Sequence, residues 1–342
     1  MAILSLRAAL ADVRHVDHHA HSLLRAGPED LDAFRGLFSE ASDPRQWPHV
    51  ATTITYQRAI ALLAGQLGCD PREDAVFAHR RERDASGYAS ALLEAAGADW
   101  LLVDEGYPPA AQALTTAELG ALAKCRVAPV LRVETLTTDE HARLDDASLA
   151  WISGARANGF AALKTIVAYR GGLDLDAVPE PARGRVIDAV EANRATADPL
   201  PVQIHVGFGD PDVMLPRARP GYLKPLFERF SDTDFVLLHC YPFVREAGWL
   251  ASVYPNVFLD LSLTIPHVSR PAAVLAEAVE LAPLSKLLYA SDAVSTPELY
   301  LLAAVWWRDA LAAVLSELLP ARAALAGARM ILRENAIRLY RL

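Results

Sequence analysis

The first residues that could do chemistry lie in the stretch VDHHAH, residues 16–21, which holds three histidines and one aspartate. On a strand, side chains alternate between the two faces, so His19 and His21 are expected to point the same way and His18 the opposite way. Two imidazoles on one face can bind the same metal ion. A histidine-rich surface turn is the alternative, and this stretch alone does not decide between them.

Further side chains that can bind a metal lie in later apolar runs. They are Lys164 in AALKTIVAY, His205 in PVQIHVGF, His239 in DFVLLHCY and Asp292 in KLLYASDA. A lone histidine in an apolar strand is more often a hydrogen-bonded core residue. Burying so many ionisable groups together would be costly without a counter-charge, which one or two divalent cations would supply. Imidazoles with one carboxylate favour zinc, iron or manganese over calcium.

The elements that must position these residues are eight short apolar runs separated by helical patterns. Almost continuous apolar runs are typical of parallel strands covered on both faces. One of the helices between them is indicated by Thr115 and Glu118, which have the spacing of a capping box. Eight alternations of strand and helix predict a (β/α)8 TIM barrel, whose chemistry lies at the carboxyl ends of the strands. The predicted strands lie in residues 14–19, 100–105, 127–134, 161–169, 201–208, 234–241, 256–263 and 286–293.

The connection between the first two predicted strands is too long for an ordinary loop. It contains the helical patterns TYQRAIALLAGQLG and YASALLEAAG. We therefore predict a helical insertion, at about residues 22–97, that forms a lid or a wall of the active-site pocket. Simple elaboration of the fold or an oligomer contact is the alternative. Residues 1–342 are expected to form a single barrel domain that contains this insertion.

Composition excludes several classes of partner. The formal net charge is −9 at pH 7 and no run of lysine or arginine stands out, so nucleic-acid binding is not expected. The three cysteines are too far apart for a disulfide framework or a zinc motif. Neither a signal peptide nor a membrane-spanning run is expected, which predicts a cytoplasmic protein. The Trp-rich stretch VWWRD could pack inward or form a homodimer surface.

The order of these motifs resembles the amidohydrolase superfamily, of the amidohydrolase 2 type. The closing segment ENAIRLYRL is similar to the final helix of many members of the superfamily. The segments LRVE, LKTIVAYRGGL, QIHVGFGD, LLHCYPF and VFLDLSL are most similar to the amidohydrolase domain of nodulin/glutamine-synthetase-like (FluG-type) proteins. In that family the barrel is often fused to a glutamine synthetase domain. The fusion partner is not expected here, so glutamine chemistry is not carried over.

The resemblance gives the metal-binding residues roles. His19 and His21, with Asp292, would hold a first divalent ion, and His205 and His239 a second, unless one of these two faces the substrate instead. Asp292 would orient the metal-activated water and move its proton to the leaving group.

Lys164 has two alternative roles. As a carbamate, which related members of the superfamily form, it would bridge two metal ions. As the partner of Glu134 in an ion pair, it would leave a site for one metal.

Substrate contacts are expected from residues that follow the strands. Arg132 and Glu134 end the third, Tyr169 and Arg170 follow the fourth, and Tyr241 follows the sixth. Arginine suits a bidentate grip on a carboxylate, so Arg170 is the residue we expect to bind an anionic substrate. Each of these residues has a salt bridge or a rim position as its alternative.

The predicted function is attack by a metal-activated hydroxide on an amide, ester or thioester carbonyl of a small, carboxylate-bearing molecule. Two alternatives stay open. A non-hydrolytic decarboxylase or other lyase could use the same metal barrel, and it would release carbon dioxide without consuming water. A catalytically silent binding barrel is the third candidate function.

Overall fold

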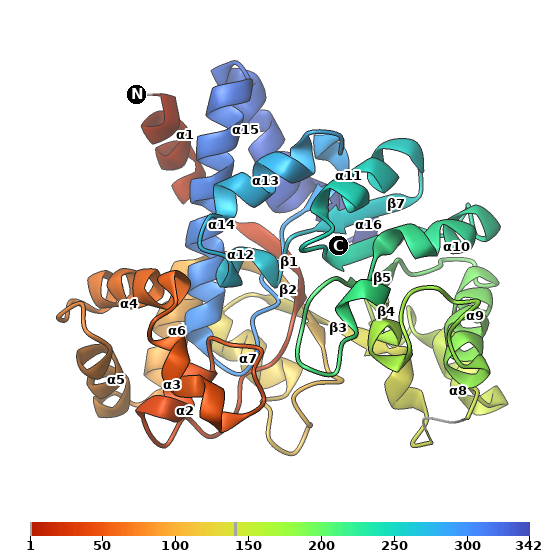
Figure 1. The fold of residues 1–342 in the computed structure, drawn as a ribbon, viewed down its shortest axis with the longest axis horizontal. Helices are drawn as coiled ribbons and strands as arrows, with labels where there is room; N and C mark the ends of the chain where they lie inside the picture. The colour runs from red at the N-terminus through yellow and green to blue at the C-terminus, as the bar shows by residue number, and fades with distance from the viewer. Residues whose placement is uncertain (1, 140–141) are drawn as a thin grey trace.

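Eight parallel strands form one sheet in the order β1 to β8, in a computed structural model that describes residues 2–139 and 142–342 (Figure 1). Each strand falls within or overlaps one of the eight predicted apolar runs, and helices flank the sheet. The predicted TIM barrel is therefore confirmed. The strands are β1 (His15–Ala20), β2 (Ala98–Asp104), β3 (Arg126–Arg132), β4 (Ala162–Thr165), β5 (Val202–Val206), β6 (Phe235–His239), β7 (Val257–Asp260) and β8 (Leu287–Leu288).

The ring closes between β1 and the segment that follows β8. The backbone N–H of His21 donates to the carbonyl of Ala293 at 2.9 Å, and the N–H of Asp292 donates to the carbonyl of His19 at 3.0 Å. These bonds bring the HxH motif and Asp292 together from opposite ends of the chain. Closure of the barrel therefore places residues from the two ends of the sequence in one site.

The helices surround the barrel and precede, follow or connect its strands (Figure 1). The predicted capping box is confirmed at Thr115, whose hydroxyl accepts from the N–H of Glu118 at 3.2 Å. The helices are α1 (Ala2–Ala11), α2 (Leu31–Gly36), α3 (Trp47–Val50), α4 (Ile54–Leu67), α5 (Glu73–Glu82), α6 (Ala85–Ala96), α7 (Thr116–Ala123), α8 (Asp146–Gly154), α9 (Glu180–Arg194), α10 (Lys224–Arg229), α11 (Val244–Val253), α12 (Thr264–His267), α13 (Pro271–Val279), α14 (Pro297–Leu318), α15 (Ala321–Arg329) and α16 (Asn335–Tyr340).

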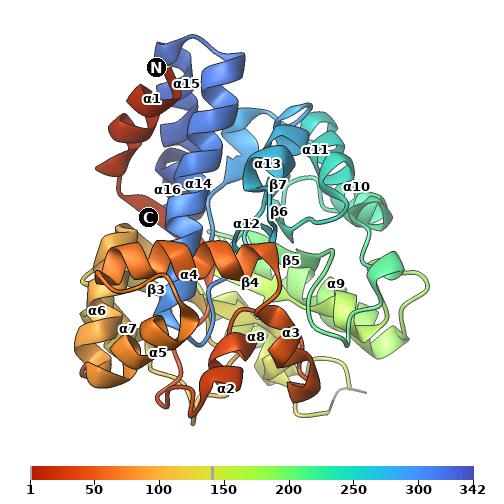
Figure 2. The same cartoon turned by 60° about the vertical axis from the view of Figure 1, so that its left-hand side comes forward.

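Five of these helices, α2 to α6, lie between β1 and β2, where the sequence predicts an insertion. In Figure 2 they form the orange group on the lower left, and α4 lies across α14. A buried carboxylate fastens the group to the barrel: Glu298 of α14 accepts from Arg80 Nε at 2.8 Å and from the Tyr88 hydroxyl at 2.9 Å. Because Glu298 is fully buried, these two bonds supply the pairing that its charge requires.

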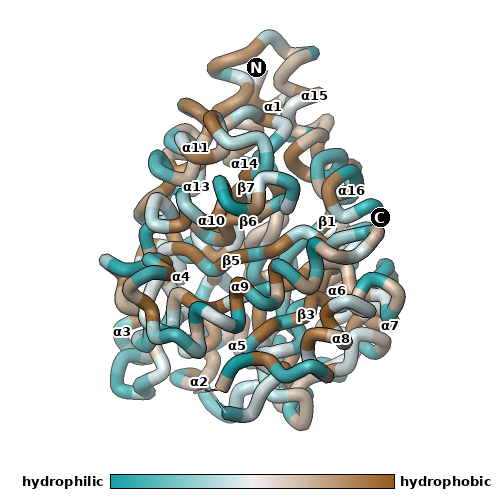
Figure 3. The backbone as a smooth tube through the Cα atoms, turned by 90° about the vertical axis from the view of Figure 1, so that its right-hand side faces the viewer, coloured by the Kyte–Doolittle hydropathy of each residue, from teal (hydrophilic) through white to brown (hydrophobic). Residues whose placement is uncertain are grey.

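The barrel interior forms a hydrophobic cluster of its own, separate from the larger cluster under the helices. Inward residues of the strands, such as Val16 and Val236, pack with Leu339 and Tyr340 of α16. The C-terminal helix therefore packs against the inward face of the strands and belongs to this inner cluster. In Figure 3 hydrophobic stretches of the tube run through the middle of the molecule, at β5 for example.

One helix, α14, is long and apolar enough to cross a membrane by length and composition alone. In this structure, however, 72% of its most apolar stretch is buried inside the protein. It contacts α6, α1 and α13, as a core helix does.

Candidate metal centre

His19 lies at the centre of the predicted site. Its side chain is completely buried, and its Nε2 atom is 3.0 Å from Lys164 Nζ and 3.0 Å from Asp292 Oδ1. Its Nδ1 atom is 2.9 Å from Gln203 Oε1. Gln203 Nε2 donates to the backbone carbonyl of His18 at 2.8 Å, which fixes the amide with its oxygen toward His19. The proton of His19 is therefore on Nδ1, and Nε2 presents a lone pair.

His21 has the same tautomer for a different reason. Its Nδ1 atom is 2.9 Å from the carbonyl of Tyr107, which can only accept, so Nδ1 carries the proton. Its Nε2 atom lies 3.3 Å from Asp292 Oδ1. Burial, followed by the charge of Lys164, lowers the pKa of His19 to about 4, so this imidazole is neutral at pH 7.

The Nε2 lone pairs of His19 and His21 converge on Asp292 Oδ1, and Lys164 Nζ, 3.0 Å from His19 Nε2, lies beside them. Asp292 Oδ1 is buried and has no hydrogen-bond partner in the described residues, although two imidazole nitrogens lie within 3.3 Å of it. Facing lone pairs repel one another unless a cation lies among them. His19, His239 and Asp292 each have a ligand atom within 4.8 Å of the others, and so do His19, His21 and Asp104. The donor set therefore fits a divalent metal ion.

His239 is held by a chain of buried hydrogen bonds from β7. Its Nδ1 atom is 2.8 Å from the hydroxyl of Ser262, and that hydroxyl donates to Asp260 Oδ1 at 2.8 Å. Because the Ser262 proton goes to the carboxylate, His239 Nδ1 donates and Nε2 is left with a lone pair. This is the arrangement by which outer residues orient metal-binding histidines.

The backbone is strained where these residues leave their strands. His239 has φ +68° and Asp292 has φ +50°, both in the left-handed region. Buried bonds stabilise these conformations: His239 N–H donates to Asp260 Oδ1 at 2.6 Å, and Ser291 N–H donates to Asp17 Oδ1 at 3.0 Å. Residues held in such strained backbone conformations are typical of functional sites.

Lys164 lies inside the site. Its side chain is buried, with Nζ against His19, and burial lowers its pKa to about 8. The predicted alternative of an ion pair with Glu134 is wrong. Glu134 Oε1 instead accepts from the Thr165 hydroxyl at 2.6 Å and from the Ile166 N–H at 2.9 Å.

His205 lies beside His239, with ring centroids 4.4 Å apart. Its Nε2 atom is 3.1 Å from the carbonyl of Phe208, so Nε2 carries the proton and Nδ1 the lone pair. Burial lowers its pKa well below the usual value. The loop returns over the ring because Gly207 has φ +82°, at a position where a Cβ would lie 2.1 Å from the Tyr241 carbonyl.

His18 does not lie where strand alternation predicts. It was expected on the opposite face from His19, but both histidines contact Gln203. The ladder register of β1 shifts between Asp17 and Ala20, which breaks the alternation. His18 Nε2 lies 2.9 Å from Asp260 Oδ2, so this histidine supports the outer carboxylate.

A cavity of about 660 Å³ opens above these residues. Tyr169, Arg170 and Arg132 line it, together with His21, Lys164, His205, His239 and Asp292. The predicted contacts Glu134 and Tyr241 are not among the lining residues. Tyr241 is 40% exposed and packs against Phe208.

The two arginines of the cavity differ in their pairing. Arg132 is committed to Asp104, with two nitrogens within 3.0 Å of Oδ2, so the predicted rim salt bridge is present. Burial alone would raise the pKa of Asp104, but Arg132 holds it below its usual value. Arg170 donates a long hydrogen bond from one guanidinium N–H to the neighbouring carbonyl of Tyr169, at 3.4 Å. Arg170 therefore keeps N–H groups for a ligand.

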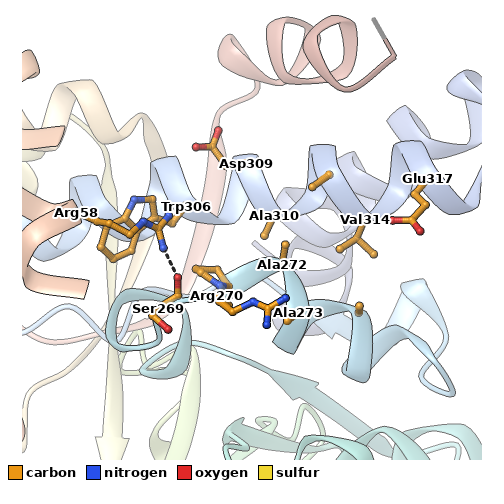
Figure 4. A pocket seen from close by; sticks show the side chains of 13 residues that line it. Arg58, Ser269, Arg270, Ala272, Ala273, Trp306, Asp309, Ala310, Val314 and Glu317 are labelled. Atoms are coloured by element: carbon orange, nitrogen blue, oxygen red, sulfur yellow. Dashed lines mark hydrogen bonds between the residues drawn. The ribbon is translucent and has the colours of Figure 1, made fainter. Parts of the chain in front are cut away.

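A second cavity, of about 470 Å³, lies between α4, α13 and α14 (Figure 4). Arg58 lies over the ring of Trp306, 5.0 Å from its centroid, and donates to the carbonyl of Ser269. None of the predicted site residues lines this cavity. Among the described residues, the predicted metal ligands that line one of these two cavities all line the first.

Sequence reasoning missed several residues of the site. Asp104 and Asp260 end β2 and β7, and their position at a strand end was the available signal. Gln203 lies two residues before His205, on the same face of β5. Glu40 and His267 have no comparable signal because they come from the insertion and from α12.

Comparison with known proteins agrees with this geometry. The family model for amidohydrolases, Amidohydro_2, matches residues 16–342. Protein fluG of Emericella nidulans is 29% identical over an alignment of 414 residues, which covers 98% of this chain and 47% of fluG. The chain therefore spans about half the length of this curated relative.

Solved structures show the same fold. A candidate metal-dependent hydrolase from Lactobacillus casei ATCC 334 has a TM-score of 0.85 and 27% identity, covering 98% of this chain and 97% of its own. A uronate isomerase of Thermotoga maritima (TM-score 0.58, 13% identity, 99% and 97% covered) and a glucuronate isomerase of Caulobacter crescentus (0.67, 15%, 99% and 94%) share the fold alone.

Proposed function

Because this chain belongs to the amidohydrolase family, we propose that it is a metal-dependent hydrolase that cleaves an amide, ester or thioester of a small, carboxylate-bearing substrate. The observation that carries this proposal is the convergence of the His19 and His21 Nε2 lone pairs on Asp292 Oδ1, within 3.3 Å. His19, His21 and Asp292 would hold the ion, with His239 and His205 completing the set. When bound, a divalent ion supplies a water of lowered pKa and polarises a carbonyl.

Asp292 is the proposed proton carrier. Beside a divalent ion this carboxyl would be ionised at pH 7 and could accept a proton. Oδ2, which lies 3.6 Å from His239 Nδ1, can take the proton from a water and return it to the leaving group. His239 would position this carboxylate or contact the substrate.

Arg170 is the proposed anchor for the substrate carboxylate. It lines the cavity beside Tyr169, and its guanidinium can donate two parallel hydrogen bonds to a carboxylate. Arg132 is paired with Asp104, and Glu134 and Tyr241 do not line the cavity. Tyr169, whose ring centroid is 4.6 Å from that of His205, would orient the substrate over the metal ligands.

The number of metal ions follows from the state of Lys164. A carbamate on Nζ would give a binuclear site of zinc, iron or manganese, whereas an unmodified lysine leaves one ion. Elemental analysis of the purified protein, with His19→Ala/His21→Ala as the variant and exposed His49→Ala as its control, decides between them. Two equivalents, lost only in the double variant, with a carbamate carbon signal after labelling with ¹³CO₂, indicate the binuclear site. One equivalent indicates the mononuclear site.

The same preparation tests the reaction class. Metal-dependent hydrolysis in a panel of anilides, esters and thioesters supports the proposal, and release of carbon dioxide without uptake of water favours a lyase. Protein that takes up no metal under any loading condition refutes both and leaves a binding barrel. A single barrel domain over residues 1–342, a homodimer and a cytoplasmic location remain our predictions, as does the lack of nucleic-acid and membrane partners.

A further inference from the structure

Glu40 is an acidic side chain of the helical insertion that the proposed hydrolysis does not use. It follows α2 and lines the same cavity as Arg170 and Asp292. Its side chain is 28% exposed, and in the described residues it has no hydrogen-bond partner. The base facing it is His267 of α12, whose Nε2 atom lies 3.8 Å from Glu40 Oε1. That distance is too long for a hydrogen bond.

The tautomer of His267 turns an acceptor toward Glu40. His267 Nδ1 lies 2.9 Å from the carbonyl of Leu263, and a carbonyl can only accept, so Nδ1 carries the proton. Burial lowers the pKa of His267, which keeps the ring neutral. Nε2 therefore presents a lone pair toward Glu40. A cationic donor with two N–H groups would favour the carboxylate form of Glu40 and could bond to both atoms.

The charges around Glu40 do not compensate its carboxylate. Burial, followed by repulsion from Asp292 and Asp210, raises the pKa of Glu40 to about 8, so the carboxyl holds a proton at pH 7 until a cation takes its place. No lysine or arginine of the described residues forms an ion pair with Glu40. The hydroxyls of Tyr107 and Tyr169, both in the same cavity, are neutral groups and cannot supply the charge. The cavity thus has at Arg170 a guanidinium that keeps N–H groups for a ligand, although Asp210 lies near it, and at Glu40 an acid that pairs with no lysine or arginine of the described residues.

We propose that Glu40, with His267 beside it, binds an ammonium group of the substrate, so that the cavity selects molecules that carry both an amine and a carboxylate. This inference rests on the proposed function, because the bound molecule is the one that reaches the metal ligands. The ammonium donates to Glu40 Oε1 and to His267 Nε2, and Arg170 holds the carboxylate. The helical insertion then determines which substrates enter.

The test uses two probes that differ by one ammonium group, L-norvaline and pentanoate, titrated into the zinc-loaded protein by calorimetry. Both carry the carboxylate that Arg170 would bind. A buried bond to a charged group corresponds to roughly a 10- to 100-fold change in affinity, so norvaline is expected to bind tighter by about that factor. Glu40→Gln removes the preference, and Glu29→Gln, an exposed acid of the same insertion, keeps it. His267→Asn, which retains a donor for Leu263, reduces it.

Three results overturn the inference. One is the absence of any preference for norvaline in the wild-type protein, including the case in which neither probe binds. Another is a preference that survives in Glu40→Gln. The third is the loss of a metal equivalent in Glu40→Gln, which would make Glu40 a metal ligand and not an amine acceptor.

Failure of this inference is distinguishable from failure of the hydrolase proposal, because the probes bind without being turned over. Protein that prefers norvaline but hydrolyses nothing in the panel refutes hydrolysis alone. Protein that hydrolyses members of the panel and binds both probes equally refutes amine selection alone.

Discussion

Replacing Asp292 by asparagine should stabilise the metal-free protein and abolish its response to metal. The carboxylate oxygen Oδ1 faces the Nε2 lone pairs of His19 and His21 at 3.0 and 3.3 Å. An asparagine amide places an N–H group in the same position, where it can donate to His21 Nε2, whereas the single lone pair of His19 Nε2 already faces Lys164 Nζ at 3.0 Å. The backbone imposes no penalty, because asparagine tolerates the left-handed conformation found at this position, φ +50°. The same change removes the charge that a divalent ion needs.

The magnitude follows from the number of bonds gained. One buried hydrogen bond, to His21 Nε2, predicts an increase of about 0.5–1.5 kcal/mol in the free energy of unfolding in chelator. With zinc at about 100 times its dissociation constant, the wild-type protein should gain about 2.7 kcal/mol, and Asp292→Asn should gain little. The order of stability should therefore reverse, or at least the gap should close, on adding metal.

Urea unfolding in chelator and in excess zinc measures both quantities. Asp70→Asn, an exposed change between α4 and α5, serves as the control and should match the wild type in both conditions. A variant that is less stable than the wild type in chelator would mean that the imidazole Nε2 atoms carry protons and already donate to Asp292. The argument for converging lone pairs, and with it the metal centre, would then be wrong.

Three further changes test other parts of the structure. Ser262→Ala removes the acceptor of His239 Nδ1 and should weaken metal affinity about 10- to 100-fold in chelator competition, whereas the exposed change Ser252→Ala should leave it unchanged. Unchanged affinity in Ser262→Ala would contradict the role of the hydrogen bonds that join His239, Ser262 and Asp260. Arg80→Ala leaves Glu298 buried without its cation and should lower the free energy of unfolding by about 3–5 kcal/mol; a loss below about 1 kcal/mol would show that the pair does not anchor the insertion. The pKa of Glu40 is raised from 4.5 to about 8, so the stabilisation that its proton provides is complete below about pH 4.5 and is lost as pH rises through 8. Glu40→Gln should therefore flatten the pH dependence of the free energy of unfolding between pH 5 and 9 by about 2 kcal/mol, less than the full shift implies because the group is partly exposed. Parallel curves for the variant and the wild type would contradict the raised pKa.

The fold was predictable because its signals are local and repeated. Each parallel strand is buried on both faces, so it appears in the sequence as a short apolar run, and the capping box at Thr115 marks a helix through backbone chemistry alone. The lengths of the strands were less predictable. For example, β8 has two residues, Leu287–Leu288, although the apolar run extends to residue 293. Beyond Leu288 the chain bonds to β1 through isolated contacts.

The site was predictable only as far as strand alternation holds. Lys164 and His205 point inward because their neighbours in β4 and β5 point outward. His239 and Asp292 break this rule through positive φ angles, and the register of β1 shifts at Asp17. Such deviations depend on hydrogen bonds from distant residues, which no local pattern of the sequence records.

Glu134 shows the same limit for polar contacts. Its position at the end of β3 favours a partner on β4, and the structure does place it against β4. The partner, however, is the Thr165 hydroxyl and the Ile166 N–H, not the ammonium of Lys164. Lys164 lies instead against His19, because both point into the barrel. The sequence indicates which strands are neighbours, and the three-dimensional packing decides which atoms meet.

The metal ligands and the proposed amine site are similar in chemistry but lie on different elements of the fold. In both, the lone pair of a neutral histidine faces a carboxyl group, an arrangement that a bound cation would stabilise. The metal ligands extend from barrel strands and are held by buried chains such as Ser262 to Asp260. Glu40 and His267 lie on the insertion and on α12, which are joined by a bond from the Thr55 hydroxyl to the His267 carbonyl at 3.3 Å. Because loops tolerate change more readily than barrel strands, substitutions around Glu40 should alter which substrate binds while the metal ligands keep their geometry.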